Sequence, residues 1–150
     1  MRRESAACMF TNTRHHSLIA WQRADDLFIR LHLLTLKQLP AFEKFELGSQ
    51  LRKAAYSVAA NIVEGFARRS GKSRLNFLNI AEGSLAEVGY CVHVAHRLGY
   101  ISDDLAAELE KDVNGVGAPL AGLVRSTRAE VATVIVGIAV AAVLVSWLAA

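Results

Sequence analysis

Four segments of the chain carry core-type residues at alternating spacings of three and four. The first segment begins after Ser17, a plausible N-cap, and ends before Pro40. Its stripe comprises Trp21, Ala24, Phe28, Leu31 and Thr35, widened by Leu27 and Leu34. Because this spacing places the side chains on one face of a helix, it predicts an amphipathic α-helix.

Three further amphipathic helices follow by the same argument. The second starts near Gly48-Ser49, and its stripe comprises Leu51, Ala55, Val58, Ile62 and Phe66. The polar stretch "RRSGKS" separates it from the third, whose stripe comprises Leu78, Ala81, Leu85, Val88, Val92 and Ala95. After Gly99, a fourth helix capped by Ser102 or Asp103 carries Leu105, Leu109, Val113, Val116, Leu120 and Leu123. Since Gly115, Gly117 and Pro119 weaken its middle, we expect a kink or a break there.

These patterns predict an all-α protein, an antiparallel up-down-up-down four-helix bundle over residues 17–128. Residues 1–16 have no periodicity and form a flexible leader in this interpretation. Residues 129–150 are expected to form an extra apolar C-terminal helix. No stretch alternates between apolar and polar residues for long enough to predict a sheet.

The last twenty residues, 131–150, read "VATVIVGIAVAAVLVSWLAA" and contain no charge. As a helix they would span about 30 Å, the thickness of a bilayer core, so they are a candidate membrane anchor. Arg125 and Arg128 precede the segment and would keep the bundle cytoplasmic, either free or on the cytoplasmic face of the inner membrane. Gly137 and Ala141 are a small pair at which two such helices can approach. The alternatives are a buried fifth helix, an oligomer core, or an accidental extension of the reading frame.

Charge is distributed unevenly along the chain, although the net charge is only +3. Between Arg52 and Arg74 there are six basic residues and one acid, Glu64, whereas residues 103–112 carry five acids and Lys111. The basic residues are Arg52, Lys53, Arg68, Arg69, Lys72 and Arg74. We interpret them as a candidate surface for the phosphates of RNA or DNA, bound without sequence preference; the alternative is a solvated turn.

The chain carries no motif that indicates catalysis or metal binding. Cys8 and Cys91 are too few and too far apart for a metal motif, and His93 and His96 are more typical of a solvated or packed pair than of ligands. Phosphate loops, zinc-protease signatures and nucleophile elbows are absent from the sequence. We therefore expect a protein that is not an enzyme, with no metal, no cofactor and no small-molecule substrate.

Two Glu-Gly pairs, Glu64-Gly65 and Glu82-Gly83, lie inside predicted helices. Because glycine in a helix interior costs about 1 kcal/mol relative to alanine, Gly65 and Gly83 are candidates for close packing of the second helix on the third. Ser57, Asn61 and Glu64 form a polar stripe beside the apolar one. This stripe is either a solvated face or an oligomer interface whose hydrogen bonds fix the register.

Four stretches together resemble a known bacterial family: "LIAWQRADDL", "QLRKAAYSVAANIVEGFARRS", "FLNIAEGSLAEV" and "AHRLGYIS". In order and spacing they are similar to four-helix bundle proteins that include the intervening-sequence proteins of 23S ribosomal RNA genes and, more distantly, the accessory proteins of diversity-generating retroelements. The residues that match the family's signature are Asn61, Glu64, Gly65, Gly83, Ser84 and Glu87, with the basic residues Arg52, Arg68 and Arg69. The resemblance implies a non-enzymatic bundle that assembles as a homo-oligomeric ring, often a pentamer, with a basic surface suited to nucleic acid. A protein-protein interaction scaffold with no nucleic-acid role is the alternative function.

Overall fold

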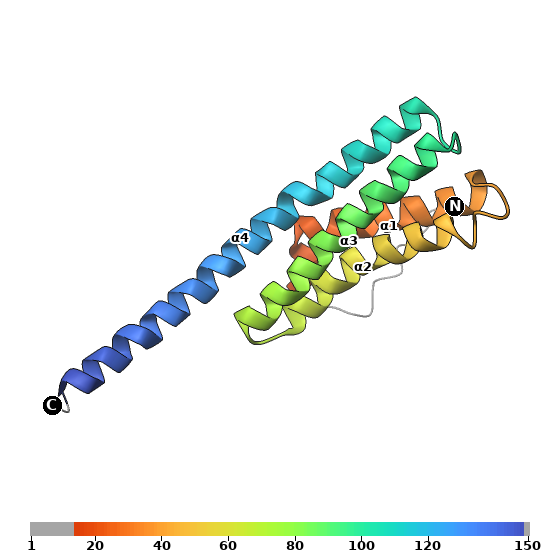
Figure 1. Ribbon diagram of the computed structural model, residues 1–150. Coiled ribbons are helices and arrows are strands. Elements are labelled where there is room, and N and C mark those ends of the chain that lie inside the picture. The colour runs from red at the N-terminus through yellow and green to blue at the C-terminus, as the bar shows by residue number, and fades with distance from the viewer. Residues whose placement is uncertain (1–13, 149–150) are drawn as a thin grey trace, which may run out of the picture.

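The computed structural model describes residues 14–148 and is all helical over that part of the chain. A 3₁₀ turn, η1 (Arg14–Ser17), precedes α1 (Ile19–Gln38), α2 (Leu47–Ala67), α3 (Gly71–Arg97) and α4 (Asp103–Leu148). Figure 1 shows α1, α2, α3 and the first part of α4 packed as a bundle, with the rest of α4 extending beyond it. Most of the predicted leader lies outside the described residues, and Leu18, not Ser17, occupies the N-cap position of α1.

The four helices form a closed antiparallel bundle, which confirms the predicted fold. α1 and α3 each lie beside both α2 and α4. The diagonal pairs, α1 with α3 and α2 with α4, are farther apart. Every helix contributes to one core, whose fully buried large side chains include Leu31, Leu51, Ile62, Leu78, Leu109 and Leu120. Because these residues belong to the predicted stripes, the three-and-four spacing identified the inward faces correctly.

Local signals define the connection between α3 and α4. Gly99 adopts a positive φ of 72°, and its N–H donates to the carbonyl of His96 at 2.9 Å, while the Tyr100 N–H donates to the carbonyl of Ala95 at 2.9 Å. This pair of bonds is a Schellman motif, in which glycine is favoured at the left-handed position. The Ser102 hydroxyl then accepts from the Leu105 N–H at 3.3 Å and caps α4.

The expected break in the fourth helix is absent, because α4 continues through Pro119 without interruption. Proline has no N–H, so the carbonyl of Gly115, four residues earlier, has no helical donor. A guanidinium nitrogen of Arg23 on α1 donates to this carbonyl at 2.7 Å. The bundle thus supplies from a neighbouring helix the hydrogen bond that proline removes.

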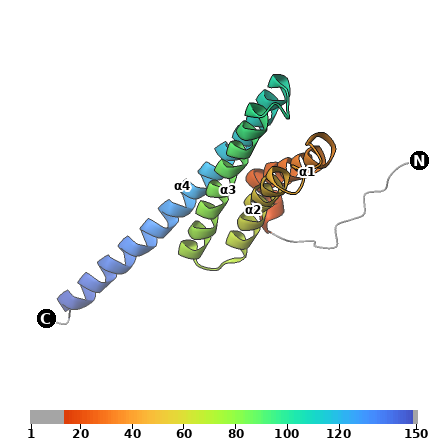
Figure 2. The same ribbon diagram turned by 45° about the vertical axis from the view of Figure 1, so that its right-hand side comes forward.

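The apolar C-terminal segment is helical, but it continues α4 and does not start a separate helix. The buried residues of α4 end at Thr127, and among the residues whose burial is described Val131 is the last that is partly buried. The most apolar 18-residue stretch of this helix has a mean hydropathy of 2.3, and none of its residues is buried. Figures 1 and 2 both show this part of α4 projecting alone, so within the described residues it does not pack as a fifth helix of its own bundle.

A candidate basic surface at the turn between α2 and α3

The turn between α2 and α3 is short and well capped. The Arg68 N–H donates to the carbonyl of Gly65 at 3.2 Å as α2 ends, and the Ser70 hydroxyl caps α3 by accepting from the Ser73 N–H at 3.5 Å. A Cβ added at Gly65 would lie 3.3 Å from both the Arg74 carbonyl oxygen and the Phe77 Cβ. Gly65 therefore lies where α2 and α3 approach most closely at this end.

The second glycine predicted for close packing does not have that role. A Cβ added at Gly83 would meet no atom within 4 Å, and the residue is exposed. Gly83 lies on the outer face of α3, whereas its neighbour Ser84 points inward and is buried. Close approaches that the sequence did not indicate occur at Gly48 and Gly71, where an added Cβ would lie 3.0 Å from the Glu43 carbonyl oxygen and 3.1 Å from the Val131 Cγ2.

The six predicted nucleic-acid-binding cations do not form one cluster. Arg52 and Lys53 lie near the start of α2, and the sixteen residues that separate Arg52 from Arg68 correspond to about 24 Å along the helix. The Arg52 guanidinium donates to the Thr35 hydroxyl at 3.0 Å and to the Lys44 carbonyl at 2.8 Å. Arg52 therefore ties α2 to α1 and the preceding loop, while Lys53 is exposed.

Two of the four cations at the turn have internal partners. Arg74 is only 17% exposed; it forms an ion pair with Glu130 of α4 at 3.0 Å and covers the Phe66 ring at 5.3 Å. Arg68 forms an ion pair with Glu64 and lies 4.9 Å from the centre of the Phe77 ring. Arg74 thus joins α3 to α4, whereas Arg68 remains exposed at the surface.

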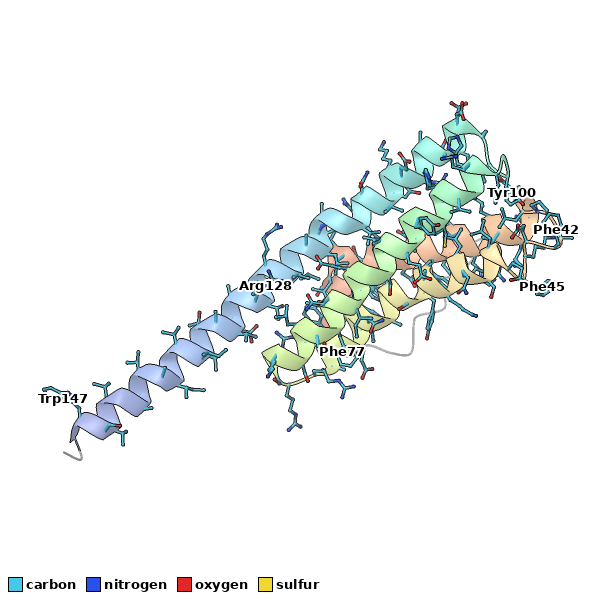
Figure 3. The ribbon with its side chains drawn as sticks, viewed as in Figure 1. Phe42, Phe45, Phe77, Tyr100, Arg128 and Trp147 are labelled. Atoms are coloured by element: carbon cyan, nitrogen blue, oxygen red, sulfur yellow. The ribbon has the colours of Figure 1, made fainter. Side chains whose placement is uncertain are left out.

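Arg69 and Lys72 are exposed, and neither makes an ion pair within residues 14–148. With Arg68 they form what we call the turn surface. Figure 3 places Phe77 at this end of the bundle and Phe42, Phe45 and Tyr100 at the opposite end.

Two more exposed arginines lie on α4 near the level of the turn. They are Arg125 and Arg128, the same residues that precede the apolar segment in the sequence. Gly71 packs against Glu130 and Val131, which brings the start of α3 next to this part of α4. Arg125 and Arg128 could not be assigned to the turn from sequence, because about fifty residues separate them from it.

The predicted interface stripe is engaged within the chain. The Ser57 and Ser84 hydroxyls are 2.8 Å apart, and the Asn61 amide donates to the Ser57 carbonyl at 2.8 Å and to its hydroxyl at 3.0 Å. Glu64 is paired with Arg68. These side chains connect α2 to α3 or stabilise α2 itself, so they need no second subunit for their hydrogen bonds.

A groove of about 370 Å³ runs between α1 and α2. It is lined by Trp21, Asp25, Phe28, Tyr56, Ala59, Ala60, Val63 and Glu64. Tyr56 is 60% exposed and its ring packs edge-on against Phe28, with the centroids 5.7 Å apart. Glu64 is the one member of the predicted stripe that borders this apolar surface.

The titratable groups of the bundle are dispersed. In the described part of the chain, no three His, Cys, Asp or Glu side chains come together as they would around a metal ion. Cys91 is buried in the core, and burial raises the pKa of its thiol. His93 is exposed, whereas the ring of His96 lies 2.7 Å from the Asp103 carboxylate at the start of α4.

Comparisons with known proteins agree with this fold. A crystal structure of a protein of unknown function from the S23 ribosomal protein family of Bacteroides thetaiotaomicron VPI-5482 superposes with a TM-score of 0.67 at 20% identity, covering 71% of this chain and 96% of that chain. No curated protein matches significantly. The profile of the family described as "23S rRNA-intervening sequence protein" matches residues 16–122, well over half of the chain. The chain therefore belongs to the 23S rRNA-intervening sequence protein family.

Proposed function

We propose that the protein is a non-enzymatic, oligomeric helical bundle that binds the phosphate backbone of RNA or DNA at the turn surface. The observation that carries this proposal is the pair Arg69 and Lys72, exposed and without an ion pair in the described residues. Both lie at the N-terminal end of α3, where the helix dipole favours anions. Membership of a family described by an intervening sequence of 23S rRNA supports an RNA-related role.

The contacts around the turn favour sequence-tolerant binding. The rings of Phe66 and Phe77 are covered by the guanidinium groups of Arg74 and Arg68, so they are not free to stack on bases. Binding through phosphates alone carries no sequence information. One copy offers only a few cations, and a homo-oligomeric ring such as a pentamer would multiply them into a strong multivalent site.

A titration of labelled RNA and DNA of mixed sequence against the full chain, over a series of salt concentrations, tests the proposal. The double variant Arg69→Ala with Lys72→Ala is expected to bind several-fold more weakly and to lower the salt slope by about one for each phosphate that is no longer neutralised. The matched control removes the same charge at exposed positions away from the turn, by Lys37→Ala with Lys111→Ala. Equal affinity and equal salt slope for both double variants would mean that the turn is only solvated.

A protein-interaction scaffold is the second candidate function. Phe42 and Phe45 are 67% and 82% exposed at the end of the bundle opposite the turn, where the Phe42 ring packs against Tyr100 (Figure 3). Exposed aromatic side chains are typical of protein interfaces. The ratio of absorbance at 260 and 280 nm (standard wavelengths for nucleic acid and protein) before and after a high-salt wash separates the two functions, because only a nucleic-acid-binding protein loses co-purified nucleic acid.

The C-terminal part of α4 is proposed to anchor the bundle to the cytoplasmic face of a membrane. The segment has the length and the composition of a membrane span, and no residue of its most apolar stretch is buried. An isolated helix can enter lipid because its backbone hydrogen bonds are satisfied internally. Arg125 and Arg128 favour retention of the bundle on the cytoplasmic side.

A further inference from the structure

The start of α3 packs on α4 at the point where the charged part of α4 ends. A Cβ added at Gly71 would lie 3.1 Å from the Val131 Cγ2 and 3.4 Å from Glu130 Oε1. A groove of about 180 Å³ at this contact is lined by Ser70, Gly71, Lys72, Glu130, Val131, Val134 and Ile135. Lys72 therefore borders the first turn of the uncharged segment.

Two acids near this level, Glu64 and Glu130, form ion pairs, whereas several cations do not. Glu130 is the last charged residue of the chain, and Arg74 pairs with it. Glu64 is paired with Arg68. Four exposed cations near this level make no ion pair within the described residues, and we call them the collar: Arg69, Lys72, Arg125 and Arg128.

The collar residues lie within a short distance of Val131, measured along the axis of α4. At 1.5 Å per residue, Arg128 and Arg125 lie about 4.5 and 9 Å from Val131 along the axis. Lys72 and Arg69 flank Gly71, which contacts Val131 itself. The headgroup layer on each side of a bilayer is about 5–7 Å thick, so with Val131 at the edge of the hydrocarbon these cations lie in or next to that layer.

The collar residues lie on two opposite sides of α4. Glu130 points towards Arg74 on α3, and at 3.6 residues per turn Arg128 projects about 160° away from Glu130. A nucleic-acid duplex would contact only the cations on the side that it approaches. A plane perpendicular to the helix can contact the cations on both sides at once.

We propose that the collar docks on the anionic phospholipid headgroups of the membrane that holds the tail, so that the turn between α2 and α3 lies on the lipid surface. This inference rests on the proposed membrane anchor. Lys and Arg residues close to an anionic leaflet each strengthen attachment about fivefold. Because Arg69 and Lys72 also belong to the turn surface, lipid and nucleic acid exclude each other there.

A fluorescence experiment on the full chain tests the docking. Cys8 and Cys91 are replaced by Ser and Ala, and a label is attached through Ser70→Cys at the turn or, as a control, through Ser102→Cys at the opposite end. The chain is reconstituted into vesicles that carry a headgroup-linked quencher, made of zwitterionic lipid alone or with anionic lipid added. Sedimentation after an alkaline wash reports separately whether the tail is inserted.

The label at residue 70 is expected to be quenched in anionic vesicles, more weakly in zwitterionic ones, and less at high salt, whereas the label at 102 stays unquenched. Replacing Arg69 and Lys72 by Ala, which weakens attachment about 25-fold, should reduce the quenching. If the tail is inserted but the quenching depends neither on lipid charge nor on Arg69 and Lys72, the docking is wrong and the membrane anchor still holds. Quenching relieved by RNA yet insensitive to lipid charge would assign the collar to nucleic acid instead. If the alkaline wash removes the chain from the vesicles, both the anchor and the docking are wrong. That result would say nothing about nucleic-acid binding.

Discussion

At the scale of single residues, the two glycines of the Glu-Gly pairs have opposite environments. Gly65→Ala is expected to destabilise the bundle, because the new methyl group would lie 3.3 Å from the backbone of Arg74 and from Phe77. Gly83→Ala should stabilise it by up to about 1 kcal/mol, because the methyl group meets nothing and alanine is the better helix former. The midpoints of urea unfolding of the two variants measure both effects. If Gly65→Ala raises the midpoint as Gly83→Ala is expected to, the close approach at Gly65 does not affect stability.

Sequence alone could not distinguish these glycines. Each follows a glutamate, and each interrupts a helix with the same loss of propensity. Whether a neighbouring helix lies within 4 Å depends on how α2 is rotated against α3, which the apolar stripe alone does not determine. Arg52 presents the same difficulty, because its position in a basic run gave no sign of the Thr35 and Lys44 acceptors.

At the scale of the element, Pro119 and Arg23 decide whether α4 remains one helix. Arg23→Ala leaves the Gly115 carbonyl without its donor and should cost about 1 kcal/mol of unfolding free energy. In a Pro119→Ala background the N–H of the new alanine restores the helical bond, so the same Arg23 change should cost less. A double-mutant cycle measured by urea unfolding gives the coupling between the two sites. If Arg23→Ala lowers the unfolding free energy equally in both backgrounds, Arg23 does not compensate for the proline.

The break at Gly115, Gly117 and Pro119 was expected from their low helix propensity. Tertiary packing outweighs local propensity when a helix packs in a core. Val116 and Leu120 are buried on either side of the proline and hold α4 against the bundle. The missing donor comes from a residue 92 positions earlier in the chain. The local sequence showed where the helical hydrogen bond is lost, but it gave no sign of the donor that replaces it.

At the scale of the whole molecule, the exposed C-terminal part of α4 predicts membrane retention. The full chain should stay in the membrane pellet through an alkaline carbonate wash, and a chain ending at Glu130 should become soluble. Val140→Arg adds a cost of about 2.5–3.5 kcal/mol near the bilayer centre and should shift the chain towards the soluble fraction. Should the full chain be soluble throughout, a second copy or another protein must cover the apolar helix, and the anchor is wrong.

Periodicity predicted the whole-molecule fold well, because each helix buries one regular stripe and short connections make neighbours antiparallel. The candidate site was predicted only in part. Arg68, Arg69 and Lys72 are adjacent in sequence and remain adjacent at the turn, so composition found them. Arg125 and Arg128 reach the level of the turn only through the packing of Gly71 on α4, which is a long-range contact.

The continuity of α4 has a mechanical consequence. Its 46 residues make a rod about 69 Å long, which joins the bundle to the tail without a flexible linker. A rod transmits torque, so a tilt or rotation imposed on its far end turns the bundle as well. Pro119 is where such a rod would bend first, since one of its backbone hydrogen bonds is missing there. The bond from Arg23 to Gly115 braces that point, and its loss would place a hinge in the rod.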